Sequence, residues 1–96
     1  MVNLAANLSM MFNEVDFMGR FKQASNQKFK SVEYLFPYDF SKDDILNELN
    51  ENNLTQVLFD LPAGNWDSGD RGIAADPNRI TEFEDGVGLA LEFANV

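Results

Sequence analysis

The sequence predicts an α/β fold built on parallel strands. Short apolar segments typical of buried strands alternate with longer segments whose apolar residues recur at helical spacing. The alternation repeats three times in 96 residues, so we expect a β-α-β-α-β-α order within one domain. Strands that alternate with helices in this way imply a parallel sheet with right-handed crossovers.

The first βα unit is expected in residues 4–27. Leu4 to Met11 is apolar with small polar interruptions, which predicts a buried strand. Asn13, followed three residues later by Asp16, is typical of a capped helix start and predicts a helix over residues 14–27. The residues expected on the core face of this helix are Phe17, Met18, Phe21, Ala24 and Ser25.

The second unit repeats this pattern. Residues 31–36 predict a strand that ends before Pro37. Ser41 with Asp44 is a second capping pattern, and the helix that it starts is expected to close at Asn52 and Asn53, with Ile45, Leu46 and Leu49 facing inward.

The third unit contains the longest loop of the chain. Residues 54–61 predict a strand, after which a Gly- and Asp-rich segment leads to Asp76. Asp76 is expected to cap a third helix with Pro77 at its first position, where a missing N–H costs nothing. The apolar stripe expected along this helix is Ile80, Phe83, Val87, Leu91 and Ala94.

Alternation along the strands favours a barrel over a doubly wound sheet. Successive side chains point to opposite faces, so each strand has one apolar face and one mixed face. The apolar face of the third strand is expected to hold Val57, Phe59 and Leu61. The mixed faces hold Asn7, Ser9, Glu33, Gln56 and Asp60. A barrel places helices outside and an increasingly polar interior near the carboxyl ends of its strands, which fits this division.

The composition excludes several functions. The net charge is −9, and residues 43–96 hold twelve acidic but only two basic groups, so a nucleic acid partner is not expected. There is no Cys and no His, which removes thiolate chemistry and the usual general base near neutral pH. The first residues lack the features of a signal peptide and no apolar run reaches membrane-spanning length, so we expect a soluble cytoplasmic protein without a membrane partner.

Three segments resemble the hydroxypyruvate isomerase family. They are AANLSMMFNEV (Ala5–Val15), VEYLFPYDFS (Val32–Ser41) and LPAGNWDSGDRGIA (Leu61–Ala74), and the last is most similar to the 2-oxo-tetronate isomerase branch. The resemblance implies a TIM barrel of the xylose isomerase-like kind. It also implies proton transfer between adjacent carbons through an enediolate, with hydroxypyruvate and tartronate semialdehyde, or related 2-oxo acids, as substrates.

The same resemblance implies that the chain is partial. The family's catalytic glutamates and metal-binding residues lie on later strands, beyond Val96, so no catalytic residue, metal ligand or bound cofactor is expected in residues 1–96. The resemblance leaves room for a divalent metal in the full-length enzyme. A full barrel needs about 250 residues and eight strands. We therefore expect an N-terminal TIM-barrel fragment that is inactive alone and whose open edges favour self-association.

Several residues are candidates for lining the substrate pocket of the full-length protein. Asn7 and Glu33 lie on the expected barrel interior, where they line a pocket or form a structural hydrogen-bond network. Phe12 either lines the pocket or is a packing residue without a functional role. Asp60 ends the third expected strand, where it contacts substrate or caps the loop.

Two further candidates lie in the long loop. Arg71 suits an anionic 2-oxo acid and Trp66 could close over the pocket; alternatively, both fasten the loop or contact a neighbouring subunit. One departure from the resemblance lies elsewhere: Lys28 stands where relatives usually carry Gly, which predicts a less favourable end for the first helix.

Two other functions remain open at this point. A small acidic α/β module that associates with a partner chain would explain the chain without any enzyme activity. A self-contained enzyme would require a carboxylate pair such as Glu33 and Asp60 to carry all acid–base steps without a His.

Overall fold

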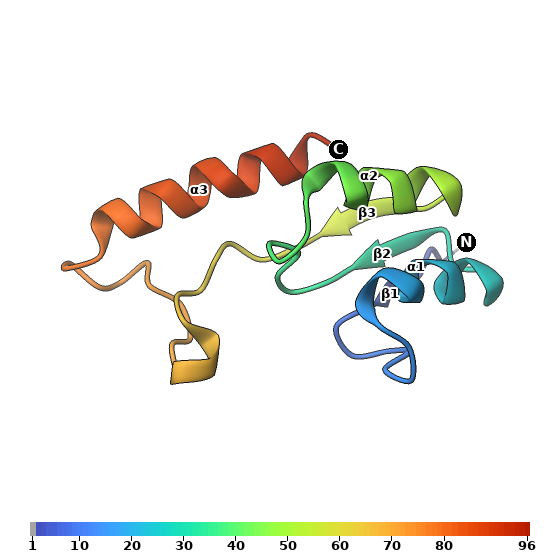
Figure 1. Cartoon of the computed structure of the whole chain (residues 1–96), viewed down its shortest axis with the longest axis horizontal. Helices are drawn as coiled ribbons and strands as arrows, with labels where there is room; N and C mark the ends of the chain where they lie inside the picture. Colours follow the sequence, from blue (N-terminus) through green and yellow to red (C-terminus); the bar gives the residue numbers. More distant parts are fainter. Residues whose placement is uncertain (1) are drawn as a thin grey trace. The chain divides into compact units, whose positions relative to one another are not determined.

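The computed structural model describes residues 2–96, which form two compact units, one ending at Phe59 and the other spanning Asp60–Val96. The first unit holds β1 (Ala5–Asn7), α1 (Phe17–Asn26), β2 (Ser31–Glu33), α2 (Lys42–Glu51) and β3 (Thr55–Leu58) (Figure 1). The second holds a short 3-10 helix η1 (Trp66–Ser68) and α3 (Ile80–Ala94). The predicted β-α-β-α-β-α order is confirmed.

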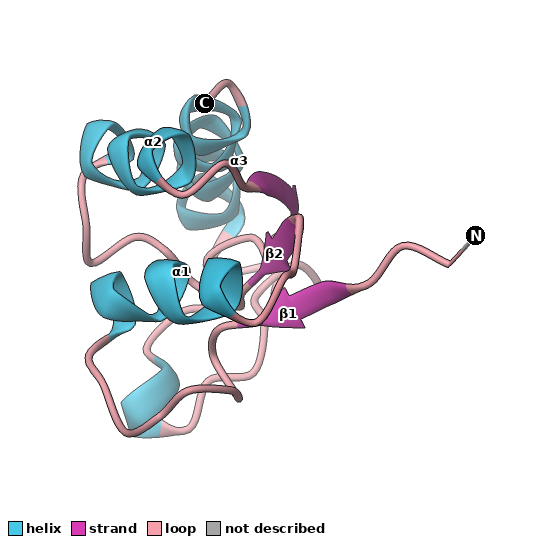
Figure 2. Cartoon of the chain, turned by 90° about the vertical axis from the view of Figure 1, so that its right-hand side faces the viewer, coloured by secondary structure: helices cyan, strands magenta, loops and turns pink. Residues whose placement is uncertain are grey.

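The three strands of the first unit form one parallel sheet in the order β1-β2-β3. Ala6 lies beside Val32 and Val32 beside Gln56, and an irregularity after Val32 places Glu33 opposite Leu58. The helices α1 and α2 lie on the same side of this sheet (Figure 2). This one-sided cover was predicted from the apolar and mixed faces of the strands.

The core of the first unit fills the space between sheet and helices. Its fully buried apolar side chains are Ala6, Leu8, Phe21, Ala24, Val32, Tyr34 and Ile45. The rings of Phe17 and Phe21 lie edge to face at 5.5 Å, and Phe17 meets Tyr34 at 5.4 Å and Phe40 at 5.2 Å. Aromatic pairs at these separations add to the free energy of burial. Of the inward-facing residues predicted on α1 and α2, four are buried (Phe21, Ala24, Ile45 and Leu49) and four are half-buried (Phe17, Met18, Ser25 and Leu46).

The alternation of side chains predicted for the third strand is wrong. Gln56 was expected on the mixed interior face, but it shares a face with Val32 and its side chain accepts a hydrogen bond from the buried Tyr34 hydroxyl. Val57, expected under the helices, is 53% exposed. The reason is that the register is set by pairing with β2, and a polar partner for Tyr34 satisfies a hydroxyl that burial would otherwise leave unpaired.

The strands are also shorter than predicted. The expected strand over residues 4–11 ends at Asn7, because the amides of Met10 and Met11 both turn back to the Asn7 carbonyl at 3.1 and 2.9 Å. The following helix is capped by Asp16, whose carboxylate accepts from the Gly19 amide at 2.9 Å, and not by Asn13.

Both helices of the first unit end in the same left-handed turn. Lys28 has φ 74° and Asn53 has φ 54°. After each, an amide donates to a carbonyl five residues back along the chain: Phe29 N donates to Ala24 O at 3.1 Å, and Leu54 N donates to Leu49 O at 2.9 Å. This is the Schellman pattern, whose left-handed position is usually a glycine. The unfavourable end predicted for α1 at Lys28 is thus present.

The second unit departs most from prediction. Helix α3 begins at Ile80, not at Asp76 and Pro77, because the Asp76 carboxylate instead accepts from the Asn78 amide at 2.9 Å and closes a turn. Ile80 and Leu91, expected to be buried, are 58% and 60% exposed. The side chains along α3 that are buried are Ala90 and Phe93.

Helix α3 approaches the preceding loop closely at Gly86. A Cβ added at Gly86 would lie 3.4 Å from the ring of Pro62, so the absence of a side chain there lets α3 meet the loop.

Across residues 2–96, each helix is too short or too polar to span a membrane.

Candidate functional site

Two of the candidate residues meet at the carboxyl ends of β1 and β2. Asn7 and Glu33 are the last residues of their strands and lie side by side in register. The Asn7 side-chain amide donates to the Glu33 carboxylate over 3.4 Å, and its oxygen accepts from the Ser9 amide at 3.0 Å. The structure thus brings together two residues that are 26 positions apart in sequence and that were both predicted on the barrel interior.

Both side chains of this pair remain half-buried rather than sealed in the core. The Ser9 hydroxyl continues the network by accepting from the Leu35 amide at 2.9 Å. The bond between Asn7 and Glu33 is at the long end of the accepted range, so it is weak and exchangeable. The arrangement can present a carboxylate and an amide to a hydroxylated ligand, and it also satisfies the strand ends. Both interpretations stated from the sequence fit it.

Phe12 lies in the loop between β1 and α1, half-buried and with φ 62°. A left-handed φ is uncommon outside glycine and marks a locally strained position. The loop is held by Arg20 of α1, which donates to the Leu8 carbonyl at 2.8 Å and to the Val15 carbonyl at 3.0 Å. Arg20 was missed by the sequence reasoning. An arginine placed directly before the buried Phe21 was the available signal.

Asp60 lies just beyond the end of β3 and opens the second unit. It is half-buried and already has an interaction partner. This engagement is compatible with the loop-capping interpretation and leaves its contact with a substrate a prediction.

Trp66 and Arg71 are brought together within the second unit. The Arg71 guanidinium carbon lies 3.9 Å from the centroid of the Trp66 ring. Its Nη1 donates to two backbone carbonyls, that of Trp66 at 2.8 Å and that of Asp70 at 2.7 Å. The guanidinium is thus held by stacking on one side and by hydrogen bonds at one nitrogen.

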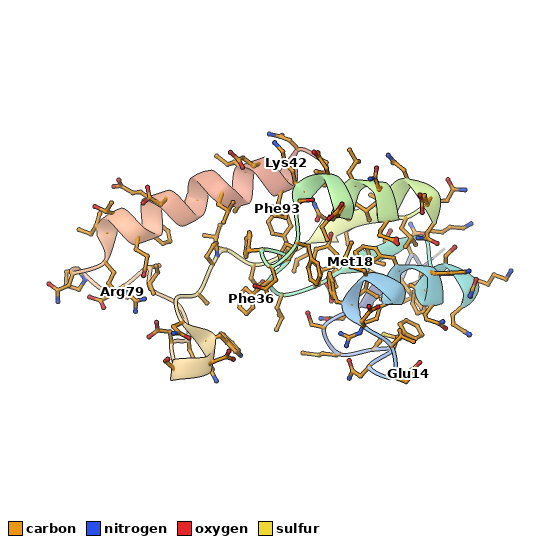
Figure 3. The ribbon with its side chains drawn as sticks, in the orientation of Figure 1. Glu14, Met18, Phe36, Lys42, Arg79 and Phe93 are labelled. Carbon is orange, nitrogen blue, oxygen red and sulfur yellow. The ribbon has the colours of Figure 1, made fainter. Side chains whose placement is uncertain are left out.

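An ionic clasp, formed by Asp70, Arg79 and Glu82, holds the loop that carries these two residues. Arg79 lies at the start of α3 (Figure 3) and its Nη2 is 2.9 Å from the Asp70 carboxylate. Nε and Nη2 of Arg79 also donate to both oxygens of Glu82, at 2.7 and 3.1 Å. Asp70 accepts from the Asn65 amide at 2.7 Å.

The clasp changes the proton affinity of its members. Hydrogen bonds from Arg79, and then from the Asn65 amide, lower the pKa of Asp70, and the two carboxylates raise the pKa of Arg79. Asp70 and Arg79 are therefore both charged near neutral pH. The loop is tight at this point, since a Cβ at Gly64 would lie 2.4 Å from Asp70 Oδ2.

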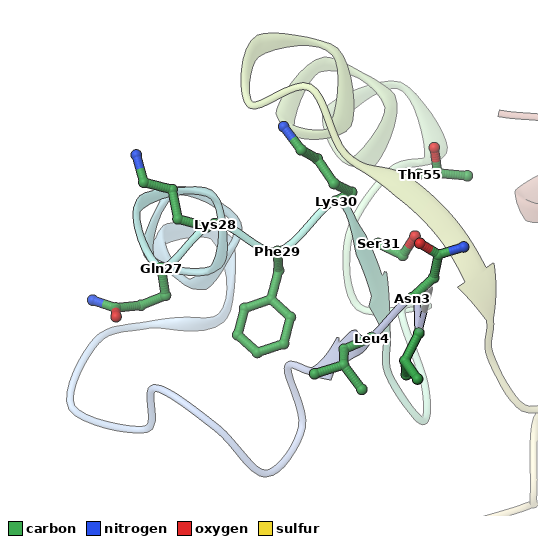
Figure 4. A pocket seen from close by; sticks show the side chains of 9 residues that line it. Asn3, Leu4, Gln27, Lys28, Phe29, Lys30, Ser31 and Thr55 are labelled. Carbon is green, nitrogen blue, oxygen red and sulfur yellow. The ribbon is translucent and has the colours of Figure 1, made fainter.

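An open cavity of about 510 Å³ lies at the other end of the sheet (Figure 4). It is lined by the residues before β1, by residues 27–30, which connect α1 to β2, and by Ser31 and Thr55, which begin β2 and β3. Because residues that begin β2 and β3 line it, this cavity is at the opposite end of the sheet from Asn7 and Glu33. Catalytic residues of parallel barrels lie at the carboxyl ends of strands, which is the end that holds Asn7 and Glu33. Within residues 2–96, no group of carboxylates converges closely enough to hold a metal ion.

The chain is similar to proteins that carry isomerase names, although no family model matches it. It is 46% identical over 94 residues to "Hydroxypyruvate isomerase" of Escherichia coli (strain K12), covering 98% of this chain and 36% of that protein. It is also 46% identical over 96 residues to "2-oxo-tetronate isomerase" of Cupriavidus necator, covering 100% of this chain and 37% of that protein. The chain thus spans about a third of the length of these relatives.

A solved structure shares the fold. The crystal structure of AP endonuclease, family 2 from Brucella melitensis matches with a TM-score of 0.95 at 54% identity, over 98% of this chain and 36% of that one. The resemblance found in the three sequence segments is therefore confirmed along the chain. Its three parallel βα units are those of a xylose isomerase-like TIM barrel, and in sequence it is related to about a third of hydroxypyruvate isomerase and 2-oxo-tetronate isomerase.

Proposed function

We propose that the whole protein containing this chain is an isomerase that interconverts a 2-oxo acid such as hydroxypyruvate with its aldehyde isomer through an enediolate. The observation that carries the proposal is the 46% identity to two proteins named as such isomerases, over 98% and 100% of this chain. On this proposal the chain supplies three of the barrel's strands and part of its pocket.

The chain's own residues would bind and orient the substrate rather than transfer its protons. Asn7 and Glu33 support this role because they are adjacent at the carboxyl ends of β1 and β2, the end at which barrel enzymes bind substrates. Phe12 joins them in the proposal as a residue that follows the end of β1, and Asp60, which opens the second unit, is proposed separately because it follows the end of β3. The described residues do not supply a set of metal ligands, so no step assigned to them depends on a metal.

The name of the structural relative suggests a different chemistry, which the charge of this chain disfavours. An endonuclease must approach a polyanionic backbone, and such proteins gain affinity from clustered Lys and Arg. Residues 43–96 carry twelve acidic and two basic groups, net −10. This favours a small substrate over DNA.

The test is an assay of the whole protein on hydroxypyruvate in D2O, in which NMR follows both isomer formation and deuterium entry at the carbon next to the carbonyl. Glu33→Gln should lower kcat/KM by about tenfold, the scale of one charged hydrogen bond. Glu51→Gln, an exposed acid in α2, is the matched control and should change little. Cleavage of abasic DNA without any isomer formation would refute the proposal.

Association is a second candidate function, favoured by one observation. Within residues 2–96, β3 is an outer strand of the sheet, and its Val57 and Leu58 are 53% and 50% exposed. Exposed apolar strands at a sheet edge invite pairing. Sedimentation of the 96-residue chain at several concentrations tests this: self-association that Val57→Lys abolishes would support it, and a monomer at all concentrations would refute it.

Two predictions complete the proposal. A role in carbohydrate metabolism follows if the isomerase activity is found, because the substrate class is a small sugar acid. The cytoplasmic location predicted from the sequence is tested by fractionation of source cells.

A further inference from the structure

We propose that Arg71, held on the face of Trp66, is a receptor for the carboxylate group of the small 2-oxo acid. This inference rests on the proposed function and adds to it the residue that recognises the acid group. It concerns the second unit alone, and its evidence is the set of contacts that fix the guanidinium.

Arg71 uses one of its nitrogens for hydrogen bonds within the protein. Among the described residues, its Nη1 donates to the carbonyls of Trp66 and Asp70 at 2.8 and 2.7 Å. The stack on Trp66 at 3.9 Å fixes the plane of the group. The edge formed by Nε and Nη2 keeps its N–H donors, and this forked edge matches the two oxygens of a carboxylate.

The acidic groups of the chain itself could compete for Arg71. The protein carries sixteen acidic residues, yet among residues 2–96 none lies within salt-bridge distance of Arg71. Asp70, its neighbour in sequence, is instead occupied by Arg79 at 2.9 Å and by the Asn65 amide at 2.7 Å. The ionic clasp thus engages the Asp70 carboxylate, whose charge still acts on Arg71, and leaves Arg71 without an ion pair among the described residues.

The loop around Arg71 is already ordered without a ligand. Asn65 caps η1 by accepting from the Ser68 amide at 3.2 Å, and Gly69 closes it at φ 105°. Because the loop is already folded around Arg71, binding would not have to immobilise this long side chain, which ordinarily costs affinity. Trp66 is a positioning residue in this proposal, since it acts through the orientation of Arg71.

The binding experiment uses the whole protein with labelled arginine, and NMR follows the Nε–H signal of Arg71, assigned by its loss in Arg71→Lys. Glycolate should shift the signal saturably, whereas ethylene glycol, which lacks the carboxylate, should not. If glycolate leaves the signal unmoved, or if sulfate at equal ionic strength shifts it as much, the proposal is overturned. This readout does not require catalysis.

The kinetic experiment separates this proposal from the proposed function. Arg71→Lys should raise KM for hydroxypyruvate about tenfold with little change in kcat, since tenfold corresponds to about 1.4 kcal/mol of lost binding. Lys22→Gln, which removes an exposed cation on α1, should change neither. Trp66→Leu should resemble Arg71→Lys, and Trp66→Phe should restore much of the affinity.

The outcomes are distinguishable. An active isomerase whose KM is unaffected by Arg71→Lys would leave the function standing and overturn the receptor. A protein that binds glycolate at Arg71 but does not isomerise hydroxypyruvate would support the receptor and refute the proposed function.

Discussion

The two units of this chain are each stabilised internally by different interactions. The first unit packs two helices on one side of a three-stranded sheet, around side chains such as Phe21, Val32 and Tyr34 that are fully buried. The second unit buries Ile73, Ala90 and Phe93, and much of its order lies in a loop of turns and charged contacts. Apolar burial is insensitive to pH, whereas exposed ion pairs weaken with acid and salt.

This difference teaches where each unit is vulnerable. The first should respond most to changes in volume, because close-packed interiors tolerate neither voids nor added atoms. The second should respond to changes in backbone conformation and charge. Substitutions in one unit with matched controls in the other test this division.

The largest effect is expected from Phe21→Ala in the first unit. Phe21 is fully buried and its ring meets those of Phe17 at 5.5 Å and Tyr34 at 5.8 Å. Truncation should lower the free energy of unfolding by about 3–5 kcal/mol, a large share of a typical domain's stability. Urea unfolding followed by circular dichroism measures it. Leu91→Ala on α3, 60% exposed, is the control and should cost less than about 0.5 kcal/mol.

Gly64→Ala should produce the next largest effect, confined to the second unit. Gly64 has φ 85°, and an added Cβ would meet Asp70 Oδ2 at 2.4 Å and Arg79 Nη2 at 2.8 Å. The strained backbone and the opened clasp should together cost about 2 kcal/mol. Hydrogen exchange should accelerate in residues 64–79 with little change in β1 and β2.

Gly69→Ala is the matched control for that experiment. Gly69 also has a positive φ, 105°, but nothing lies within 4 Å of an added Cβ. It should therefore lose only the backbone term, about 1 kcal/mol. Equal losses at the two glycines would contradict the claim that the clasp contributes to the order of the loop.

The first unit was predictable because its signals are local and agree with one another. Helical spacing identified the buried Phe21 and Ala24, and the Ser41 hydroxyl accepts from the Asp44 amide at 3.1 Å as the capping pattern predicted. Strand parity and strand ends placed Asn7 beside Glu33. Gln56 escaped prediction because register depends on β2 and on the Tyr34 hydroxyl, neither of which the local pattern of β3 contains.

The second unit was less predictable because its deciding contacts join separated residues. Asp76 followed by proline satisfies the pattern of a helix start and equally that of a turn. The structure uses the turn, and α3 starts only after Arg79, which binds Asp70 and Glu82. The contact of Arg20 with the Leu8 carbonyl in the first unit was missed for the same reason.

Lys28→Gly should stabilise the first unit by about 1 kcal/mol. Lys28 occupies the left-handed position of a Schellman turn at φ 74°, where a Cβ is unfavourable and glycine is not. Thermal unfolding should show a higher Tm. The turn after α2 offers a matched comparison, since Asn53 holds the same position at φ 54° and asparagine tolerates it better. Asn53→Gly should therefore gain less, and a larger gain at Asn53 would contradict this assignment.

The smallest effect is a difference in pH response between the units. Burial, and then the nearby charges of Glu51 and Asp16, raise the pKa of Glu48, whose Oε2 is buried without a partner among the described residues. A raised folded-state pKa means that protonation favours folding. Stability is therefore higher below the ordinary value of 4.5 and falls as pH rises through the folded-state pKa. The pKa of Asp70 is lowered by Arg79, so the clasp contributes above the ordinary value of 3.8 and is lost as pH falls.

Glu48→Gln and Asp70→Asn test these opposite dependences of stability on pH. Glu48→Gln should stabilise the first unit at pH 7, by less than about 1 kcal/mol because the group is partly solvated, and should give no gain at pH 3. Asp70→Asn should loosen residues 64–79 at pH 7, and its difference from the wild type should shrink as pH falls below the ordinary value of 3.8. Region-resolved hydrogen exchange at both pH values, corrected for the intrinsic exchange rate, measures the two effects. If both substitutions shifted the same unit in the same direction, charge would not distinguish the loop of the second unit from the packed core of the first.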